Sequence, residues 1–235
     1  MSVGEVRRLA VGLSAEAVAG AWARREHALH GSVAVLDVEI AGRLRNGVPT
    51  SGSSAVAVIV RPALAIADED RLWVAALVAA CGTGTTVWGS RPLAVWPDRI
   101  EIDGSPAAFV NVTSEFESGR IGVAIVTLRV LDASITAPFE LFRDLVVHSV
   151  GLVSAAFSEL THTFIDHSAL HGRRVRAVLL PRGETRGTVT GLGSDGCLRL
   201  ETATGMVELL SVSSVRRIDL VPPSPAASRH QAEPR

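Results

Sequence analysis

Apolar and polar positions change their spacing along this chain in a way that separates strands from helices. Residues 32–40 (SVAVLDVEI) and 54–60 are short and rich in β-branched side chains, which predicts two strands. Between them, residues 41–53 are polar and contain several glycines, which predicts a loop. Before them, Ser14 has the character of an N-terminal cap and predicts a short helix over residues 17–25.

The middle of the chain contains one helix pattern, a run of strand patterns and a second helix pattern. Three acidic residues at 68–70 precede an apolar segment that ends near Cys81, which predicts a helix with favourable negative charge at its start. Apolar positions at helical spacing predict one long helix over residues 139–166. Turn residues such as Asp103-Gly104 separate the strands predicted between these helices, at 86–89, 93–96, 99–102, 107–114 and 120–131.

Short alternating segments return after Gly172 and predict a small SH3-like barrel of five strands. Four of its strands are delimited by turn residues, at 173–180, 184–192, 197–202 and 206–211. The end of the chain is rich in Pro, Ser and Ala, which predicts a disordered tail. We therefore expect an α+β protein with a mixed or antiparallel sheet flanked by helices, divided into domains at 1–170 and 171–221 and a tail at 222–235.

Composition narrows the possible functions. All 23 basic side chains are arginine and the formal net charge is −1, which does not suit nucleic-acid binding. Apolar runs such as 73–81 are shorter than the roughly 20 residues that span a bilayer, and the N-terminus lacks a signal-peptide core. We expect a cytoplasmic protein with no nucleic-acid or membrane partner. Because the chain has no lysine, no mechanism can use a lysine of its own.

The cysteines and histidines give only weak evidence for a disulfide or a metal site. Cys81 and Cys197 lie in dissimilar segments, and two reduced thiols are favoured over a disulfide or a metal site. His167 and His171 are four residues apart, a spacing compatible with metal binding. No third ligand stands at a recognisable spacing, so partly exposed helix histidines are favoured and we predict no metal site.

A glycine- and arginine-rich loop follows the strand predicted at 32–40. Glycines allow backbone N–H groups to approach a ligand, and two arginines one residue apart can clamp a phosphate or carboxylate. Taken alone, the loop favours the alternative of two solvated surface arginines. Its candidate ligand-binding residues are Gly42, Arg43, Arg45, Asn46 and Gly47.

A second candidate segment consists of Trp96, Pro97, Asp98 and Arg99. Trp-Pro at the end of a strand is uncommon, since the proline stops the ladder and the indole can offer a flat wall to a ligand. The alternative, favoured when the segment is taken alone, is a tryptophan packed in the core beside an ordinary turn.

The order of these elements resembles the biotin protein ligases, and more broadly the biotin/lipoate ligase superfamily, from about Ser14 to Leu220. The family's loop has the form Gly-Arg-Gly-Arg preceded by Ala, and here residues 41–45 read Ala-Gly-Arg-Leu-Arg. Its second motif is Lys-Trp-Pro-Asn-Asp, and residues 95–99 here are Val-Trp-Pro-Asp-Arg. Residues 185–211 resemble the family's terminal domain, and we expect no counterpart of the DNA-binding winged helix of its bifunctional members.

The resemblance implies a two-step reaction in which biotin and ATP, with Mg²⁺, form an acyl-adenylate and pyrophosphate. The acyl group then passes to a lysine of a carrier domain, which would be the protein partner. Positioned cations are needed because two anions meet in the first step. By resemblance, Arg43 and Arg45 would hold the adenylate phosphate, and Trp96 and Pro97 would border the nucleotide.

Departures from the family pattern fall on this chemistry. Val95 and the pair at 105–106 stand where the resemblance implies lysines, Phe109 stands where a glycine is expected, and Glu39 corresponds roughly to a glutamine. The catalytic residues are therefore unknown. The hypotheses are an active, divergent ligase, and a noncatalytic relative that binds a small carboxylate, a nucleotide or a carrier domain. A structural partner in a complex is a third, and homodimer formation is left open.

Overall fold

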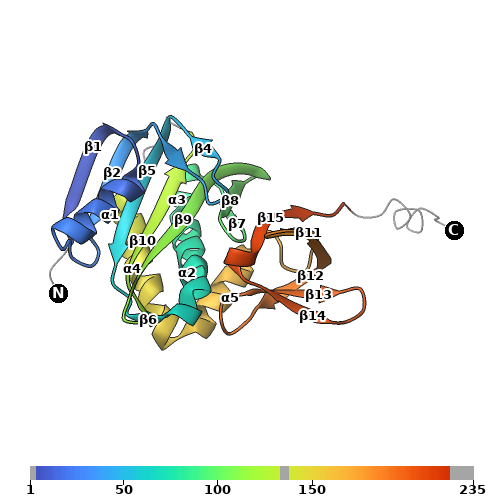
Figure 1. The fold of residues 1–235 in the computed structure, drawn as a ribbon. Helices are drawn as coiled ribbons and strands as arrows, with labels where there is room; N and C mark the ends of the chain where they lie inside the picture. Colours follow the sequence, from blue (N-terminus) through green and yellow to red (C-terminus); the bar gives the residue numbers. More distant parts are fainter. Residues whose placement is uncertain (1–3, 133–137, 223–235) are drawn as a thin grey trace.

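The largest part of the molecule is built on one mixed β-sheet (Figure 1). The structure is a computed structural model that describes residues 4–132 and 138–222. The strands are β1 (Val6–Gly12), β2 (Val33–Glu39), β5 (Ser53–Val60), β6 (Leu64–Ala65), β7 (Leu93–Val95), β8 (Arg99–Ile102), β9 (Ser105–Glu117) and β10 (Arg120–Val130). Their order is β1-β2-β5-β10-β9-β8-β7, with β6 also paired to β10. Strand β1 is parallel to β2, and the other pairs are antiparallel.

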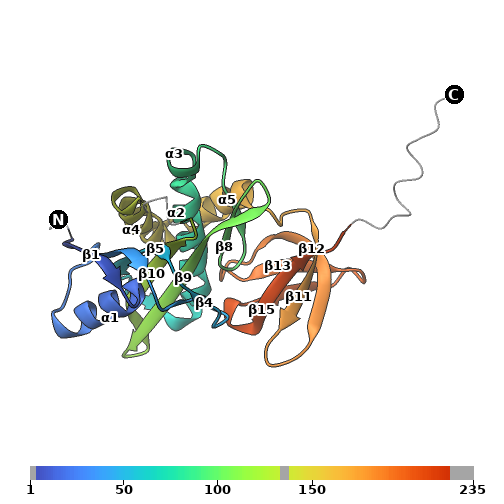
Figure 2. The same cartoon turned by 90° about the horizontal axis from the view of Figure 1, so that it is seen from above.

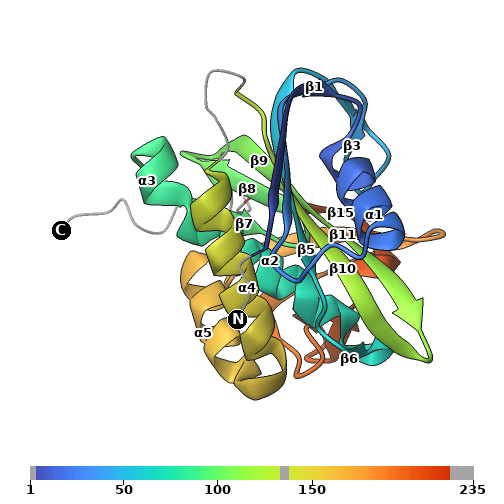
Figure 3. The same ribbon diagram turned by 90° about the vertical axis from the view of Figure 1, so that its left-hand side faces the viewer.

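Helices cover both faces of this sheet (Figure 3). They are α1 (Ala15–Arg25), α2 (Glu69–Gly82), the short α3 (Gly84–Trp88), α4 (Phe139–Ala155) and α5 (Phe157–His167). Strand β5 is apolar from Ala55 to Val60 because these residues alternate between two cores. Val56 and Val58 pack in the core with α2, α4 and α5, whereas Ala55 and Ala57 pack in the core with α1.

A separate antiparallel sheet forms the C-terminal part of the molecule (Figure 2). We call it the C-terminal sheet. Its order is β14-β13-β12-β11-β15. The strands are β11 (Arg174–Leu179), β12 (Glu184–Leu192), β13 (Leu198–Thr202), β14 (Val207–Leu210) and β15 (Val215–Leu220), with the 3-10 helix η2 (Val212–Ser214) before the last. Another 3-10 helix, η1 (Ile66–Asp68), leads into α2.

The α+β class is confirmed, together with most of the predicted elements. The predicted cap is also present, because Ser14 Oγ accepts a hydrogen bond from Ala17 N at 3.3 Å. The predicted domain limits remain predictions, and the predicted tail lies outside the described residues except for Pro222. No helix in the described ranges has the length and apolar character needed to cross a membrane.

Three local predictions were wrong or incomplete. Residues 86–89 were expected to be a strand, but residues 86–88 belong to α3, and Gly89 follows this helix in the left-handed conformation (φ 64°). The helix expected over 139–166 is divided at Ala156, whose backbone is not helical (φ −155°, ψ 56°). Strand β1 was missed because it is an edge strand whose side chains are mostly exposed, so it lacks the pattern of a half-buried strand.

Candidate functional site

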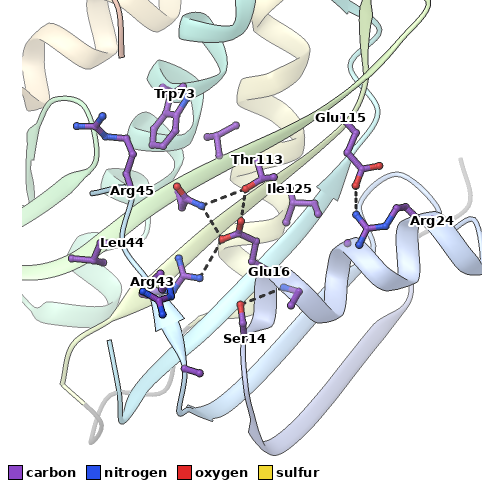
Figure 4. A pocket seen from close by; sticks show the side chains of 16 residues that line it. Ser14, Glu16, Arg24, Arg43, Leu44, Arg45, Trp73, Thr113, Glu115 and Ile125 are labelled. Carbon is purple, nitrogen blue, oxygen red and sulfur yellow. Dashed lines mark hydrogen bonds and ion pairs between the residues drawn. The ribbon is translucent and has the colours of Figure 1, made fainter. Parts of the chain in front are cut away.

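A cavity of about 500 Å³ lies between α1, the loop after β2, α2, and strands β9 and β10 (Figure 4). We call it the central cavity. Four arginines contribute to its lining, against two glutamates. Its lining residues are Ser14, Glu16, Ala17, Gly20, Arg24, Ala41, Arg43, Leu44, Arg45, Trp73, Asn111, Val112, Thr113, Glu115, Ile125 and Arg129.

A buried ion pair lies at one side of the central cavity. The Arg129 side chain is 1% exposed and the Glu39 side chain 0%, and Arg129 Nε donates to Glu39 Oε2 at 2.7 Å. Glu39 Oε1 also accepts from the backbone N–H of Ala15, in the first turn of α1, at 2.9 Å. The carboxylate therefore joins the end of β2, strand β10 and the positive end of helix α1.

Glu16 connects this pair to strand β9. Its carboxylate accepts from Arg129 Nη2 at 3.3 Å and from Asn111 Nδ2 at 2.8 Å, and it also accepts from the Thr113 hydroxyl. Figure 4 shows Glu16 pointing from α1 towards Thr113. Because every group in this cluster is held by a partner on another element, the cavity wall is preorganised.

One donor of the cluster is unused. Arg129 Nη1 is buried and has no hydrogen-bond partner among the described residues. A buried donor without a partner costs about 1–3 kcal/mol, so a ligand that offers it an acceptor gains free energy. Arg129 lines the central cavity, and its Nη1 is a candidate contact for a ligand oxygen that displaces the atoms covering it.

The predicted arginine loop is a small hairpin of β3 (Gly42–Arg43) and β4 (Pro49–Thr50). Asn46 and Gly47 form its turn, since Asn46 Oδ1 accepts from Val48 N and Gly47 has a left-handed φ of 81°. They do not line the central cavity. Arg43 does line it and is exposed, with one hydrogen bond at 3.3 Å to Gly47 O. Arg43 is therefore available to a ligand.

Gly42 is needed for close packing at the start of this hairpin. A Cβ at this position would overlap the Glu39 carboxylate and lie 2.5 Å from Thr50 Oγ1. A glycine therefore allows the hairpin backbone to lie against the buried ion pair.

Arg45 lines the central cavity but points its donors elsewhere. Its Nη1 donates to Val212 O at 3.1 Å and to Val215 O at 2.6 Å, and its Nη2 donates to Arg216 O at 3.2 Å. Its Nε contacts Asp98 Oδ2 at 3.4 Å. The arginine loop and the Trp-Pro segment therefore meet, as the resemblance implied, through Arg45 and Asp98.

The other residues of the Trp-Pro segment lie apart from the central cavity. Trp96 is completely buried and Pro97 is buried, so the indole packs in the core instead of lining this cavity. Arg99 pairs with Glu101 at 2.8 Å. Burial raises the pKa of the Asp98 carboxyl above its usual value, although the Arg45 guanidinium acts in the opposite direction.

A second cavity of about 420 Å³ lies between α2 and the C-terminal sheet. It shares Arg45, Trp73 and Val112 with the central cavity. Its other lining residues include three acids and a thiol, namely Glu69, Asp70, Asp195 and Cys197. Within the described part of the chain, no group of three or more His, Cys, Asp or Glu side chains could hold a metal ion.

Sequence reasoning missed Arg129, Glu16, Asn111 and Thr113 as site residues. Arg129 stood in an apolar segment (IVTLRVL), where a lone charge signals a buried partner or a ligand. Phe109 and Pro106, which could have filled the site, do not line the central cavity.

The fold and the C-terminal sheet match known proteins. Residues 170–214 match the family described as "Biotin protein ligase C terminal domain". The structure is similar to the biotin protein ligase from Aquifex aeolicus in complex with biotin and ATP, with a TM-score of 0.67 and 13% identity over 92% of this chain and 99% of the other.

Two further solved structures are similar. A biotin protein ligase-like protein of unknown function from Silicibacter sp. gives a TM-score of 0.64 at 13% identity, over 88% of this chain and 94% of the other. Biotin acetyl coenzyme A carboxylase synthetase from Helicobacter pylori, with bound biotinylated ATP, gives 0.58 at 13% identity, over 87% and 99%. A search of curated protein sequences finds no match.

Proposed function

Because this chain has a biotin protein ligase-like fold, we propose that it binds a small carboxylic acid of the biotin type in the central cavity and converts it, with ATP, to an acyl-adenylate. One observation carries the proposal: Arg43, Arg45 and Arg129 come from two separate segments and line one cavity. The solved relatives from Aquifex aeolicus and Helicobacter pylori, which contain biotin with ATP and biotinylated ATP, support the choice of ligands.

The chemistry requires two anions to approach each other. A carboxylate oxygen of the acid forms a bond to the α-phosphorus of ATP, while the bond from that phosphorus to the β-phosphate oxygen breaks and pyrophosphate leaves. Donors placed where negative charge develops stabilise this step. Arg43 is exposed at the cavity and Arg129 has a free Nη1, so these two residues would supply such donors.

Mg²⁺ would not find a ready protein site here. No metal-binding group of His, Cys, Asp or Glu was found in the described ranges, so the phosphates of ATP and water would supply most of its ligands.

The acyl acceptor would be a second protein. This chain contains no lysine, so it cannot carry the acyl group on a lysine of its own. We propose a carrier domain with an accessible lysine as the partner. An assay for transfer then has no background from lysine acylation of the enzyme.

A noncatalytic binding protein is the second candidate, and a specific observation favours it. Most donors of Arg45 are used by backbone carbonyls and Asp98, and Arg129 is engaged by Glu39 and Glu16. Few arginine N–H donors are then left to stabilise the negative charge that develops during adenylate formation. Such a protein would bind the acid without turnover.

Two measurements separate these candidates. Titration calorimetry with biotin, lipoate and octanoate, each with and without ATP and Mg²⁺, measures binding, and release of pyrophosphate measures turnover. We expect Arg43→Gln to reduce turnover or binding about tenfold to a hundredfold, because it removes an exposed charged donor. The matched control is Arg182→Gln, an exposed arginine of the C-terminal sheet's β11–β12 turn.

Each outcome has one meaning. Pyrophosphate release with any acid supports adenylate formation. Saturable binding without release supports the noncatalytic candidate. No binding of any acid, with or without ATP, would refute both, and equal loss in Arg43→Gln and Arg182→Gln would remove the role given to Arg43.

A further inference from the structure

Arg45 makes most of its contacts with the C-terminal sheet. The three carbonyls that accept from its guanidinium belong to the short segment 212–216, which contains η2 and the start of β15. The turn of the same loop also faces the C-terminal sheet, because Asn46 and Val48 line one cavity with Arg216 and Arg217. The Arg45 side chain therefore connects its loop to a residue 170 positions later in the chain, Val215.

Helix α2 also contacts this segment and the neighbouring part of the C-terminal sheet. Both carboxylate oxygens of Asp70 lie 3.3 Å from the backbone N of Val212, and Cys197 Sγ donates to Asp70 Oδ2 at 3.2 Å. Arg71 Nε donates to Ser194 O at 2.7 Å. A Cβ on Gly196 would lie 2.6 Å from the backbone N of Arg71, so the two backbones are in close contact. The C-terminal sheet is thus docked on polar contacts of defined geometry.

Most N–H donors of Arg45 are occupied by protein groups and are not available to a ligand. An arginine has five N–H donors, and Asp98 and three carbonyls accept four of them. A lysine could not make these contacts, since its single ammonium cannot reach carbonyls spread along a fork. Arg43, two residues away, has no comparable contacts with the C-terminal sheet among the described residues.

We infer that Arg45 is a positioning residue that docks the C-terminal sheet against the central cavity, and that occupancy of the cavity and docking of this sheet stabilise each other. The two arginines of one loop then have different roles: Arg43 meets the ligand, and Arg45 transmits the loop's position to residues 212–216. Coupling between two sites is reciprocal, so each event must favour the other equally. The docking role stands without any ligand, whereas the coupling depends on the proposed function.

Cys197 provides a reporter for docking. Its thiol is partly buried against Asp70, and burial together with that carboxylate raises the pKa of the thiol, which slows reaction with a disulfide reagent. Undocking would expose the thiol and remove Asp70 from it. The other cysteine, Cys81, is buried in α2. The labelling rate of a Cys197→Ser variant measures the reaction of Cys81 alone.

The first experiment uses the full chain without ligand. We measure the rate at which an aromatic disulfide reagent labels Cys197, together with hydrogen exchange of residues 211–216. Arg45→Gln and Arg45→Lys should both raise the labelling rate at least about tenfold, because undocking exposes the Cys197 thiol and moves Asp70 away from it. Arg43→Gln, the matched control, should leave it unchanged. Circular dichroism of each variant confirms that it is folded.

The results can overturn the inference at two points. Unchanged labelling and exchange in folded Arg45→Gln, or a lysine that restores wild-type rates, would show that Arg45 does not act as a docking fork. Biotin with ATP and Mg²⁺ should slow labelling of the wild type but not of Arg45→Gln. Faster labelling would show that the ligand takes Arg45 from the carbonyls and would refute mutual stabilisation. If these compounds do not bind in calorimetry, the proposed function and the coupling fail, but the docking role is still decided by the first experiment.

Discussion

Replacing Arg129 with methionine should destabilise the protein strongly, because it leaves the Glu39 carboxylate buried without its cation. The two side chains are 1% and 0% exposed, and their closest atoms are 2.7 Å apart. Removal of one partner of a buried pair costs about 3–5 kcal/mol. Glu39 keeps the hydrogen bond from Ala15 N, and the substitution also removes the unpartnered Nη1. We therefore expect the lower end of that range, about 3 kcal/mol.

Urea unfolding followed by tryptophan fluorescence measures this loss. All four tryptophans precede residue 97, so the signal reports on the part of the molecule that contains the ion pair. Arg8→Met is the matched control, because Arg8 pairs with Asp37 at the surface, with side chains 49% and 36% exposed. An exposed pair contributes about 0–1 kcal/mol, so the control should remain close to wild type.

A double variant tests the cause of the loss. Combining Arg129→Met with Glu39→Gln removes both charges and should be more stable than Arg129→Met alone by about 1–3 kcal/mol, because no carboxylate is left uncompensated. The reasoning is wrong if Arg129→Met costs less than about 1 kcal/mol, as a surface pair would. It is also wrong if the double variant is no more stable than the single one.

Three other predictions concern glycine packing and pH. Gly42→Ala should lower the free energy of unfolding in urea by about 1–3 kcal/mol, because the new Cβ would overlap Glu39. Gly151→Ala lies in a helix with nothing within 4 Å of the new Cβ, and it should raise the free energy of unfolding by about 0.5–1 kcal/mol. Equal effects of the two substitutions would contradict this reasoning. Burial raises the pKa of the Asp98 carboxyl above its usual value of 3.8, so the folded state holds this proton more tightly than the unfolded state. The free energy of unfolding of the wild type should therefore fall as the pH rises from 3.8 to the raised pKa. Urea unfolding of Asp98→Asn should lack this slope. Burial, with a smaller contribution from a nearby arginine, lowers the pKa of His30, so stability should fall as pH drops below its usual 6.5, and a His30→Asn variant with the same slope would refute this.

The fold was largely predictable because its strands and helices carry strong local patterns. Strand β5 is buried on both faces, and its continuous run of alanine, valine and isoleucine from Ala55 to Val60 is the consequence. Helix α3 was predicted as a strand because Thr-Thr-Val has strand character locally. The surroundings decide otherwise: Gly84 packs against Pro92 so closely that a Cβ would lie 2.4 Å from its Cδ. Tertiary contacts of this kind override local propensity.

The arginine loop shows how far the sequence alone could define a site. Arg43 and Arg45 were treated as equivalent because they share a loop, a charge and a family motif. In the structure one is exposed at the cavity and the other is bonded to carbonyls 167 to 171 residues away. No local signal distinguishes them, because the difference is made by the segment that folds against them.

The buried ion pair of Glu39 and Arg129 shows most clearly what the sequence alone could not predict. Glu39 and Arg129 each interrupt or end an apolar strand, and burying a lone charge costs so much that each position signals a partner. The sequence contains both halves of that signal but not their pairing, which spans 90 residues and depends on β2 and β10 lying on either side of β5. Once the strand order is known, the pairing follows, and with it the unused donor on Arg129. The strand order therefore determines where this protein buries a cation beside the central cavity.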